Sequence, residues 1–206
     1  MKLLSSLALA AGLALAAAVP ASAQLATDVP AGTFKIDPTH VSVTWKVMHM
    51  GLSNYTARFA KIDGTLTFDP AKPETSKLSA TIDPTSIKTD FPFVEKENFD
   101  KVLATSAKWF NSEFFDKIEF KSTAVKMTGA KTADVTGDLT LLGVTKPVVL
   151  KVTFNGGMAA HPMSKKPAVG FSATGTVKRS EFGMTANIPF IGDDVAVLIE
   201  AEMQGS

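Results

Sequence analysis

Few side chains in this sequence could carry acid–base or metal chemistry. The chain of 206 residues has three histidines and no cysteine, which excludes thiolate metal sites, thiol nucleophiles and disulfides. His40 and His49 lie in opposite phases of one predicted strand, so they face opposite sides and cannot share a metal ion. His49 follows the phase of the apolar side chains. It could donate a hydrogen bond or change charge in mild acid; a structural role is the alternative.

Enzyme motifs are incomplete in this chain. Gly170-Phe171-Ser172-Ala173-Thr174 lacks the final glycine of a serine nucleophile elbow, and Gly156-Gly157 lacks the lysine that follows in a phosphate-binding loop. Arg179 could bind a phosphate or carbonyl group, or pair with an acidic neighbour such as Glu181. We therefore expect neither an enzyme nor a metal centre nor a resident cofactor.

The composition points to an apolar interior rather than to a charged surface for a partner. Basic and acidic residues nearly cancel, 21 against 20, so no basic field for nucleic acid is expected. Fourteen phenylalanines stand against two tryptophans and one tyrosine. Because phenylalanine adds apolar area without a polar group, these rings must fill or line an apolar space.

The N-terminal segment Met1–Ala23 is typical of a secretory signal peptide. It has a charged Lys2, an apolar run over Leu7–Val19 and a small-residue cleavage site, Ala21-Ser22-Ala23. The run is too short for a comfortable membrane span, although an uncleaved anchor is the alternative. Cleavage would leave residues 24–206 as one secreted domain.

Most of the remaining sequence alternates between apolar and polar residues, which predicts half-buried strands. Many strands at short spacing favour a sandwich or a barrel. Turn residues are expected to separate them at Asp63-Gly64, Asp69-Pro70, Asp83-Pro84, Asn155-Gly156-Gly157 and Gly192-Asp193. The apolar phases are Val41–Val47, Ile62–Phe68, Leu78–Ile82, Ile118–Phe120, Val135–Leu141, Val148–Phe154, Phe171–Val177 and Val195–Met203.

One stretch has helical periodicity instead. Apolar residues at Phe99, Val102, Leu103, Ala107 and Phe110 form a stripe with helical spacing. The spacing predicts one amphipathic helix near residues 94–109, lying on an open end or an outer wall of the barrel.

Alternation by itself does not say which face of the sheet points inward. An outer-membrane barrel has the same pattern with the apolar face outside. Two tryptophans and one tyrosine are too few for two aromatic girdles, and the helix interrupts the series of hairpins. These features weigh against a membrane barrel.

The order of motifs along the chain resembles the YceI-like family of secreted lipid-binding proteins. The resemblance covers about residues 33–202 and rests on the ordered set rather than on any single motif. Its segments are Phe34–His40, Trp45–Gly51, Phe59, Asp63–Asp69, Ile82–Thr89, Ile118–Ser122, Gly137–Val148, Arg179–Met184 and Ile191–Val195.

This resemblance implies an all-β fold, an eight-stranded antiparallel, lipocalin-like barrel. It implies a periplasmic carrier that sequesters a long isoprenoid lipid or isoprenoid quinone in an apolar lumen. A homodimer and a transient contact with a membrane stay open. The alternative is a non-catalytic, stress-related structural or interaction module whose barrel is filled by its own side chains, without a cavity above roughly 300 Å³. A third class, an isoprenoid-modifying enzyme, would have only His49 as a candidate acid or base.

The candidate ligand-binding residues are apolar or lie at strand ends, and simple core packing is the alternative for each. They are Trp45, Val47, His49, Phe91, Phe99, Leu103, Phe110, Phe154, Phe171, Arg179, Phe182 and Met184.

Overall fold

The computed structural model describes residues 24–206, which form ten β-strands, three short 3₁₀ turns and one α-helix. The predicted signal peptide lies outside these described residues. The helix is α1 (Phe99–Thr105), and the 3₁₀ turns are η1 (Pro73–Thr75), η2 (Pro84–Ser86) and η3 (Arg179–Phe182). The strands are β1 (Gly32–His49), β2 (Ser53–Phe59), β3 (Ile62–Phe68), β4 (Lys77–Ile82), β5 (Ile87–Lys88), β6 (Ile118–Met127), β7 (Thr132–Leu141), β8 (Val144–Met158), β9 (Ala168–Lys178) and β10 (Ile191–Gly205).

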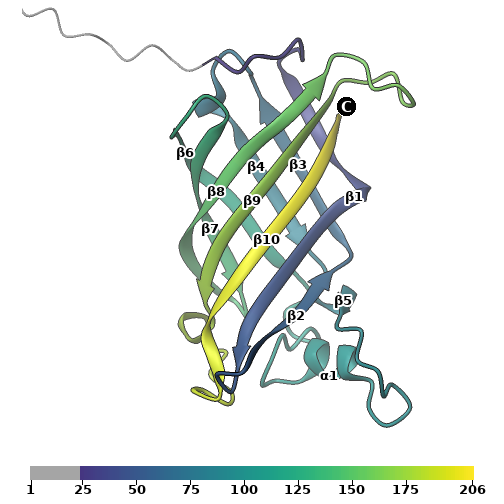
Figure 1. The fold of residues 1–206 in the computed structure, drawn as a ribbon, viewed down its shortest axis with the longest axis vertical. Coiled ribbons are helices and arrows are strands. Elements are labelled where there is room, and N and C mark those ends of the chain that lie inside the picture. Colours follow the sequence, from purple (N-terminus) through teal and green to yellow (C-terminus); the bar gives the residue numbers. More distant parts are fainter. Residues whose placement is uncertain (1–23) are drawn as a thin grey trace, which may run out of the picture.

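The ten strands close into a barrel with eight strand positions (Figure 1). Strand β1 pairs with β3 along its first part and with β2 along its second part, so β2 and β3 together occupy one position. Strands β4 and β5 likewise share the next position, because β4 pairs with β3 and β5 pairs with β2. Strand β10 pairs with β1 and closes the sheet. All pairings are antiparallel, and the predicted eight-stranded, lipocalin-like barrel is confirmed.

Ser86 links the two breaks in the wall, the one between β2 and β3 and the one between β4 and β5. Its hydroxyl accepts hydrogen bonds from the backbone N–H groups of Ala60 and Lys61, at 3.2 and 3.0 Å, and donates to the carbonyl of Asp83 at 2.6 Å. Because buried backbone donors must find partners, this buried serine allows the wall to bend between β2 and β3.

A bulge in β1 places two apolar side chains inward on either side of a polar corner. Ile36 pairs with Met203 and Val41 with Ala201, so four residues of β1 lie opposite the single residue Glu202 of β10. Asp37 holds the corner, since its carboxylate accepts hydrogen bonds from Thr39 N at 2.9 Å and Thr39 Oγ1 at 2.6 Å. Bulges of this kind bend a strand and increase its twist.

Three of the predicted turns are wrong, because the residues lie within strands. Asp63-Gly64 belongs to β3, Asn155-Gly156-Gly157 to β8, and Gly192-Asp193 to β10. At Gly64 the glycine is needed for close approach, since a Cβ there would lie 2.8 Å from Ile36 Cδ1 and from Ser79 O. A glycine that allows such packing within a strand has the same sequence signature as a turn.

The helix is shorter than predicted. The Asn98 side chain accepts a hydrogen bond from Lys101 N at 3.0 Å and caps the start of α1. Ser106 is extended and ends the helix, and its N–H donates to Val102 O. Residues 94–98 and 106–109 are therefore turn or irregular structure. Phe99, Leu103 and Phe110 of the apolar stripe nevertheless all line the cavity, whereas Ala107 is exposed. The Phe110 N–H donates back to Leu103 O at 3.1 Å.

Apolar side chains of the wall point inward and form two hydrophobic clusters. One lies beneath α1 and contains Phe59, Ile87, Leu103 and Phe182. The other lies at the opposite end, where Leu25 and Val29 of the N-terminal segment pack against the strands. The outward positions alternate with these, as in β10, where Asp194, Glu200 and Glu202 are exposed. This is the reverse of a wall that faces lipid.

None of the helices in the described part of the chain has the length and apolar character needed to cross a membrane.

Candidate ligand-binding cavity

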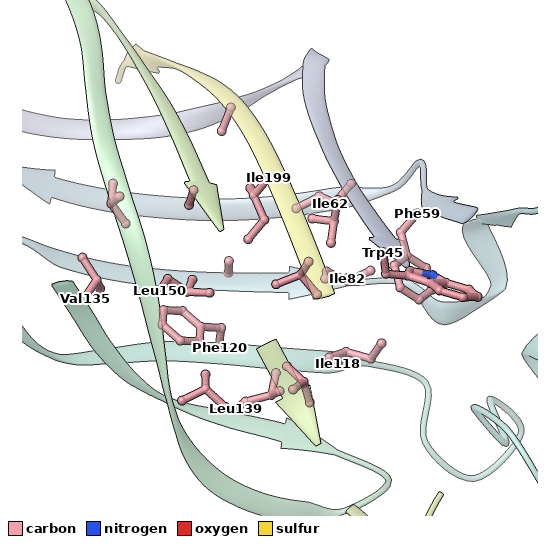
Figure 2. Close-up of a pocket in the computed structure, with 18 of the residues that line it drawn as sticks. Trp45, Phe59, Ile62, Ile82, Ile118, Phe120, Val135, Leu139, Leu150 and Ile199 are labelled. Carbon is pink, nitrogen blue, oxygen red and sulfur yellow. The ribbon is translucent and has the colours of Figure 1, made fainter. Parts of the chain in front are cut away.

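An apolar cavity of about 630 Å³ occupies the barrel between the two hydrophobic clusters. This volume lies within the range of small-molecule sites. Figure 2 shows side chains from well-separated strands, among them Ile62, Phe120, Leu139 and Ile199, pointing into the same space. The lumen is not filled by its own side chains, which favours a ligand-binding barrel over a self-filled one.

Nearly all of the predicted site residues line this cavity, although they come from five parts of the chain. The exception is Phe182, which is 1% exposed and packs in the cluster beneath α1 instead. The residues that the structure brings together are Trp45, Val47 and His49 of β1, Phe91, Phe99, Leu103 and Phe110 of the segment around α1, Phe154 of β8, Phe171 of β9, and Arg179 and Met184 near η3.

Several lining residues were not identified from the sequence. Tyr55 and Phe59 of β2 point inward, and Phe120, Leu139 and Val197 contribute large parts of the wall. The period-two phase of Tyr55, Ala57 and Phe59 is present in the sequence, but it spans few residues and includes no aliphatic run. Leu139 and Val197 lay in predicted phases, yet the phase alone does not separate lining residues from packed ones.

Aromatic rings join α1 and its flanking turns to the barrel wall. The ring of Phe59 stands edge-on against Phe110, with centroids 5.2 Å apart. Phe99 meets Tyr55 in the same way, with centroids 6.0 Å apart. Such ring pairs stabilise a fold by more than the apolar area that they bury. Ring packing therefore holds this segment over the end of the cavity.

Two polar groups at this end of the cavity, on Trp45 and Tyr55, are sheltered from solvent, whereas His49 and Asn187 line the cavity but are exposed. The indole Nε1 of Trp45 is buried and has no hydrogen-bond partner among the described residues. Burial raises the pKa of Tyr55 above its ordinary value, an effect that a hydrogen bond with Thr89 opposes. Both residues line the cavity. A buried donor without a partner costs free energy, and a guest with an oxygen acceptor could satisfy it.

Arg179 lies at the cavity rim and is held by the backbone. It is 3% exposed, and its guanidinium donates to the carbonyls of Gly192, Met184, Ala186 and Ile191 at 2.8–2.9 Å. Burial lowers the pKa of Arg179, while the neighbouring Asp193 acts in the opposite direction. Arg179 thus organises the loop before β10, and its donors go to carbonyls rather than to an acidic partner.

The opposite end of the cavity is closed by phenylalanines. Phe68 contacts both Phe154 and Phe171, with centroids 5.9 and 5.8 Å apart, and Phe34 stands edge-on to Phe68 at 6.1 Å. The cavity also reaches Lys131 next to the β6–β7 turn. An apolar chain could therefore extend from Trp45 to this ring cluster.

Three side chains on the outer face offer ligand atoms of the kind that bind a metal cation. Asp37, His40 and Glu202 have ligand atoms within 4.8 Å of one another. His40 Nδ1 contacts Asp37 Oδ2 at 3.2 Å, and Gln204 also donates to Asp37. None of the three lines the cavity, so they take no part in the candidate site.

The closed antiparallel sheet, the apolar lumen and helix α1 at one end define a lipocalin-like barrel. The chain belongs to the YceI-like family, whose domain profile matches residues 34–203. It is 44% identical over 156 residues to a UPF0312 protein of Pseudomonas putida strain W619, covering 75% of this chain and 77% of that protein. It is 42% identical to a UPF0312 protein of Pseudomonas fluorescens strain SBW25, covering 77% and 80%.

Solved structures share the barrel. BcnA of Burkholderia cenocepacia superposes with a TM-score of 0.69 at 23% identity, covering 81% of this chain and 98% of BcnA. The YceI protein of Campylobacter jejuni gives 0.65 at 29% identity, covering 78% and 91%. A structure described as a polyisoprenoid-binding domain from Saccharophagus degradans gives 0.61 at 13% identity, covering 84% and 98%.

Proposed function

We propose that this protein is a non-catalytic carrier that shelters one long isoprenoid lipid or isoprenoid quinone in its lumen. The observation that carries this proposal is the apolar cavity of about 630 Å³. The family membership supports it, as does the polyisoprenoid-binding description of the Saccharophagus degradans domain, which has the same fold.

The physical basis of binding is the removal of hydrocarbon from water. Each buried methylene contributes about 0.8 kcal/mol, and micromolar affinity needs about 8 kcal/mol. A few isoprene units supply this even after the cost of ordering the guest. No directional chemistry is required, which agrees with a lining dominated by aliphatic and aromatic side chains.

The unpartnered indole of Trp45 supports a guest that carries an oxygen. A carbonyl or hydroxyl group placed at Trp45 Nε1 would satisfy the buried donor. The tail would then run along the lumen towards Phe154 and Phe171. In this orientation the head group lies under α1.

We further propose that the protein works in the periplasm after cleavage before Gln24. The support is the sequence of Met1–Ala23. Cell fractionation and the mass of the mature chain test this part. A chain that retains residues 1–23 in the cytosolic fraction would contradict it.

The experiment for the guest is solvent extraction and native mass spectrometry of the protein purified from its own host. We expect one isoprenoid lipid or quinone for each binding site. Repeated recovery of empty protein that also takes up no added quinone would overturn the proposal. Replacing His49 with Ala addresses the enzyme alternative, because a carrier without this imidazole should still yield a co-purified guest of the same mass, whereas an isoprenoid-modifying enzyme should yield unmodified substrate.

A further inference from the structure

Exposed apolar side chains gather at one end of the barrel, which we call the α1 end. It comprises the β1–β2 turn, the segment 89–117 and the loop 183–190, at the bottom of Figure 1. Of the twelve large apolar side chains that are exposed within residues 24–206, eight lie here. They are Met48, Met50, Leu52, Phe93, Val94, Phe114, Ile188 and Phe190.

Two tips of this end, the β1–β2 turn and the loop 183–190, lack formal charge, whereas the segment 89–117 carries ten charged residues, among them Lys96 over the Phe93 ring. Residues 47–57, 91–94 and 182–192 contain no aspartate, glutamate, lysine or arginine, in a chain that is 20% charged. Surface loops are ordinarily polar. The long loop at the opposite end fits that expectation, since it carries Lys165 and Lys166.

Two of these tips form one continuous patch. The backbone N–H of Met50 donates to the carbonyl of Phe190 at 2.6 Å, and a Cβ at Gly192 would lie 3.2 Å from Met48 Cβ. The β1–β2 turn and the loop before β10 therefore lie side by side (Figure 1). Leu52 and Phe190 are exposed on them.

A chain of aromatic rings links this surface to the cavity. Phe93 is 49% exposed and contacts Phe91 with centroids 5.9 Å apart. Phe91 contacts Phe99 at 5.4 Å and Phe99 contacts Tyr55 at 6.0 Å. Tyr55 contacts Trp45 at 6.2 Å, inside the cavity. Contacting rings thus lead from Phe93 on the outer surface to Trp45 in the lumen.

We propose that the α1 end docks on the surface of a lipid bilayer and that its guest passes along the Phe93–Trp45 rings. Contiguous exposed apolar side chains mark interaction sites. A bilayer fits this site because it accepts separate uncharged apolar tips in its interfacial region and because a lipid guest could then enter the lumen without crossing water. This step rests on the proposed function, since it assumes that the guest comes from a membrane.

Flotation of the purified protein with phosphatidylcholine vesicles tests the docking surface. We expect binding that survives high salt, because the two tips that present Leu52 and Phe190 carry no charge. Leu52→Ser and Phe190→Ser should each weaken it about tenfold, since each removes a large apolar side chain from the contact. Met163→Ser is the matched control, because Met163 is 85% exposed and Leu52 84%, but Met163 lies at the opposite end. This control should bind as the wild type does.

Absence of vesicle binding by the wild type, or equal loss in Met163→Ser, would overturn the docking proposal. A wild-type dimer that Leu52→Ser converts to a monomer, without vesicle binding, would assign the patch to a second copy of the chain instead. Guest content is measured on the same samples. Protein that retains its guest but does not bind vesicles contradicts only the docking, whereas protein that floats with vesicles but was empty before they were added and takes up no added quinone contradicts the proposed guest.

Discussion

The ring of Phe120 on β6 lies directly over Gly137 on β7. A Cβ at Gly137 would be 2.6 Å from Phe120 Cε2 and 2.7 Å from the backbone oxygen of Lys121. Both residues belong to inward phases, and Phe120 lines the cavity. The glycine therefore makes room for a ring that shapes the lumen.

Replacing Gly137 with Ala should lower the free energy of unfolding by about 1–3 kcal/mol, since overpacking displaces both the ring and the backbone. Gly156→Ala is the control, because a Cβ at Gly156 meets nothing within 4 Å. Chemical denaturation measures both variants. Equal stability of the two would contradict this account of the Phe120–Gly137 contact.

Filling the lumen should abolish guest binding without unfolding the barrel. Val197 of β10 lines the cavity next to Trp45, its pairing partner on β1. The adjacent Ala196 is exposed on the outer face. We expect Val197→Trp to lose the co-purified guest and Ala196→Trp to keep it. Native mass spectrometry gives the occupancy, and thermal unfolding checks that both variants are folded. A fully loaded, folded Val197→Trp variant would place the guest elsewhere.

Arg179 should be far more important for stability than its neighbour Lys178. Removing the guanidinium leaves four backbone carbonyls without their donor. Arg179→Met should therefore cost about 3 kcal/mol or more. Arg179→Lys should also destabilise, because an ammonium group cannot reach all four acceptors.

The comparison for Arg179 is Lys178→Met. Lys178 is exposed and pairs with Asp193 and Asp194 at 3.7 and 3.1 Å, and exposed pairs contribute little to stability because solvent screens them. Urea unfolding of Arg179→Met and Lys178→Met measures the difference between their free energies of unfolding. Similar losses in both would mean that the four carbonyl contacts contribute little.

Asp37 should make stability depend on acid pH. Hydrogen bonds from the Thr39 hydroxyl and backbone N–H lower the pKa of Asp37 from 3.8 to about 2. Because the folded pKa lies below the unfolded one, the ionised carboxylate stabilises the fold above pH 3.8, and this contribution is lost as pH falls towards 2. We expect the ionised Asp37 carboxylate to contribute about 1 kcal/mol to the free energy of unfolding at neutral pH, allowing for screening by solvent.

Asp37→Asn tests this contribution. The variant should be less stable than the wild type at neutral pH, and the difference should narrow as the pH approaches 2. Denaturant midpoints measured across this range give the result. A difference that does not change with pH would show that the carboxylate charge is not the stabilising feature of the β1 bulge.

The sequence was most informative where a pattern is local. Alternation over Val41–Val47 and over Val195–Met203 predicted the two strands that close the barrel, and the ordered motifs predicted its eight positions. Alternation also grouped the candidate side chains of each strand on one face, because side chains two residues apart point to the same side, but only the closed barrel decided that this face lines a cavity.

Where glycine or capping residues intervene, the local pattern misled. Gly64 was expected in a turn, but it lies in β3 because Ile36 packs against it from another strand. The apolar stripe was expected to form a helix over residues 94–109, but Asn98 and Ser106 limit the helix to Phe99–Thr105. In both cases the deciding contact was with a side chain or cap that periodicity does not describe.

The sequence by itself determined which side chains could face an apolar interior, because that property is carried by each strand alone. Only the tertiary structure decided that the interior holds a cavity, that Phe182 packs in the core cluster beneath α1 while Trp45 faces the lumen, and that Arg179 donates to four carbonyls. These outcomes depend on the register between strands that are distant in sequence. The register fixes how much space the inward side chains leave unfilled.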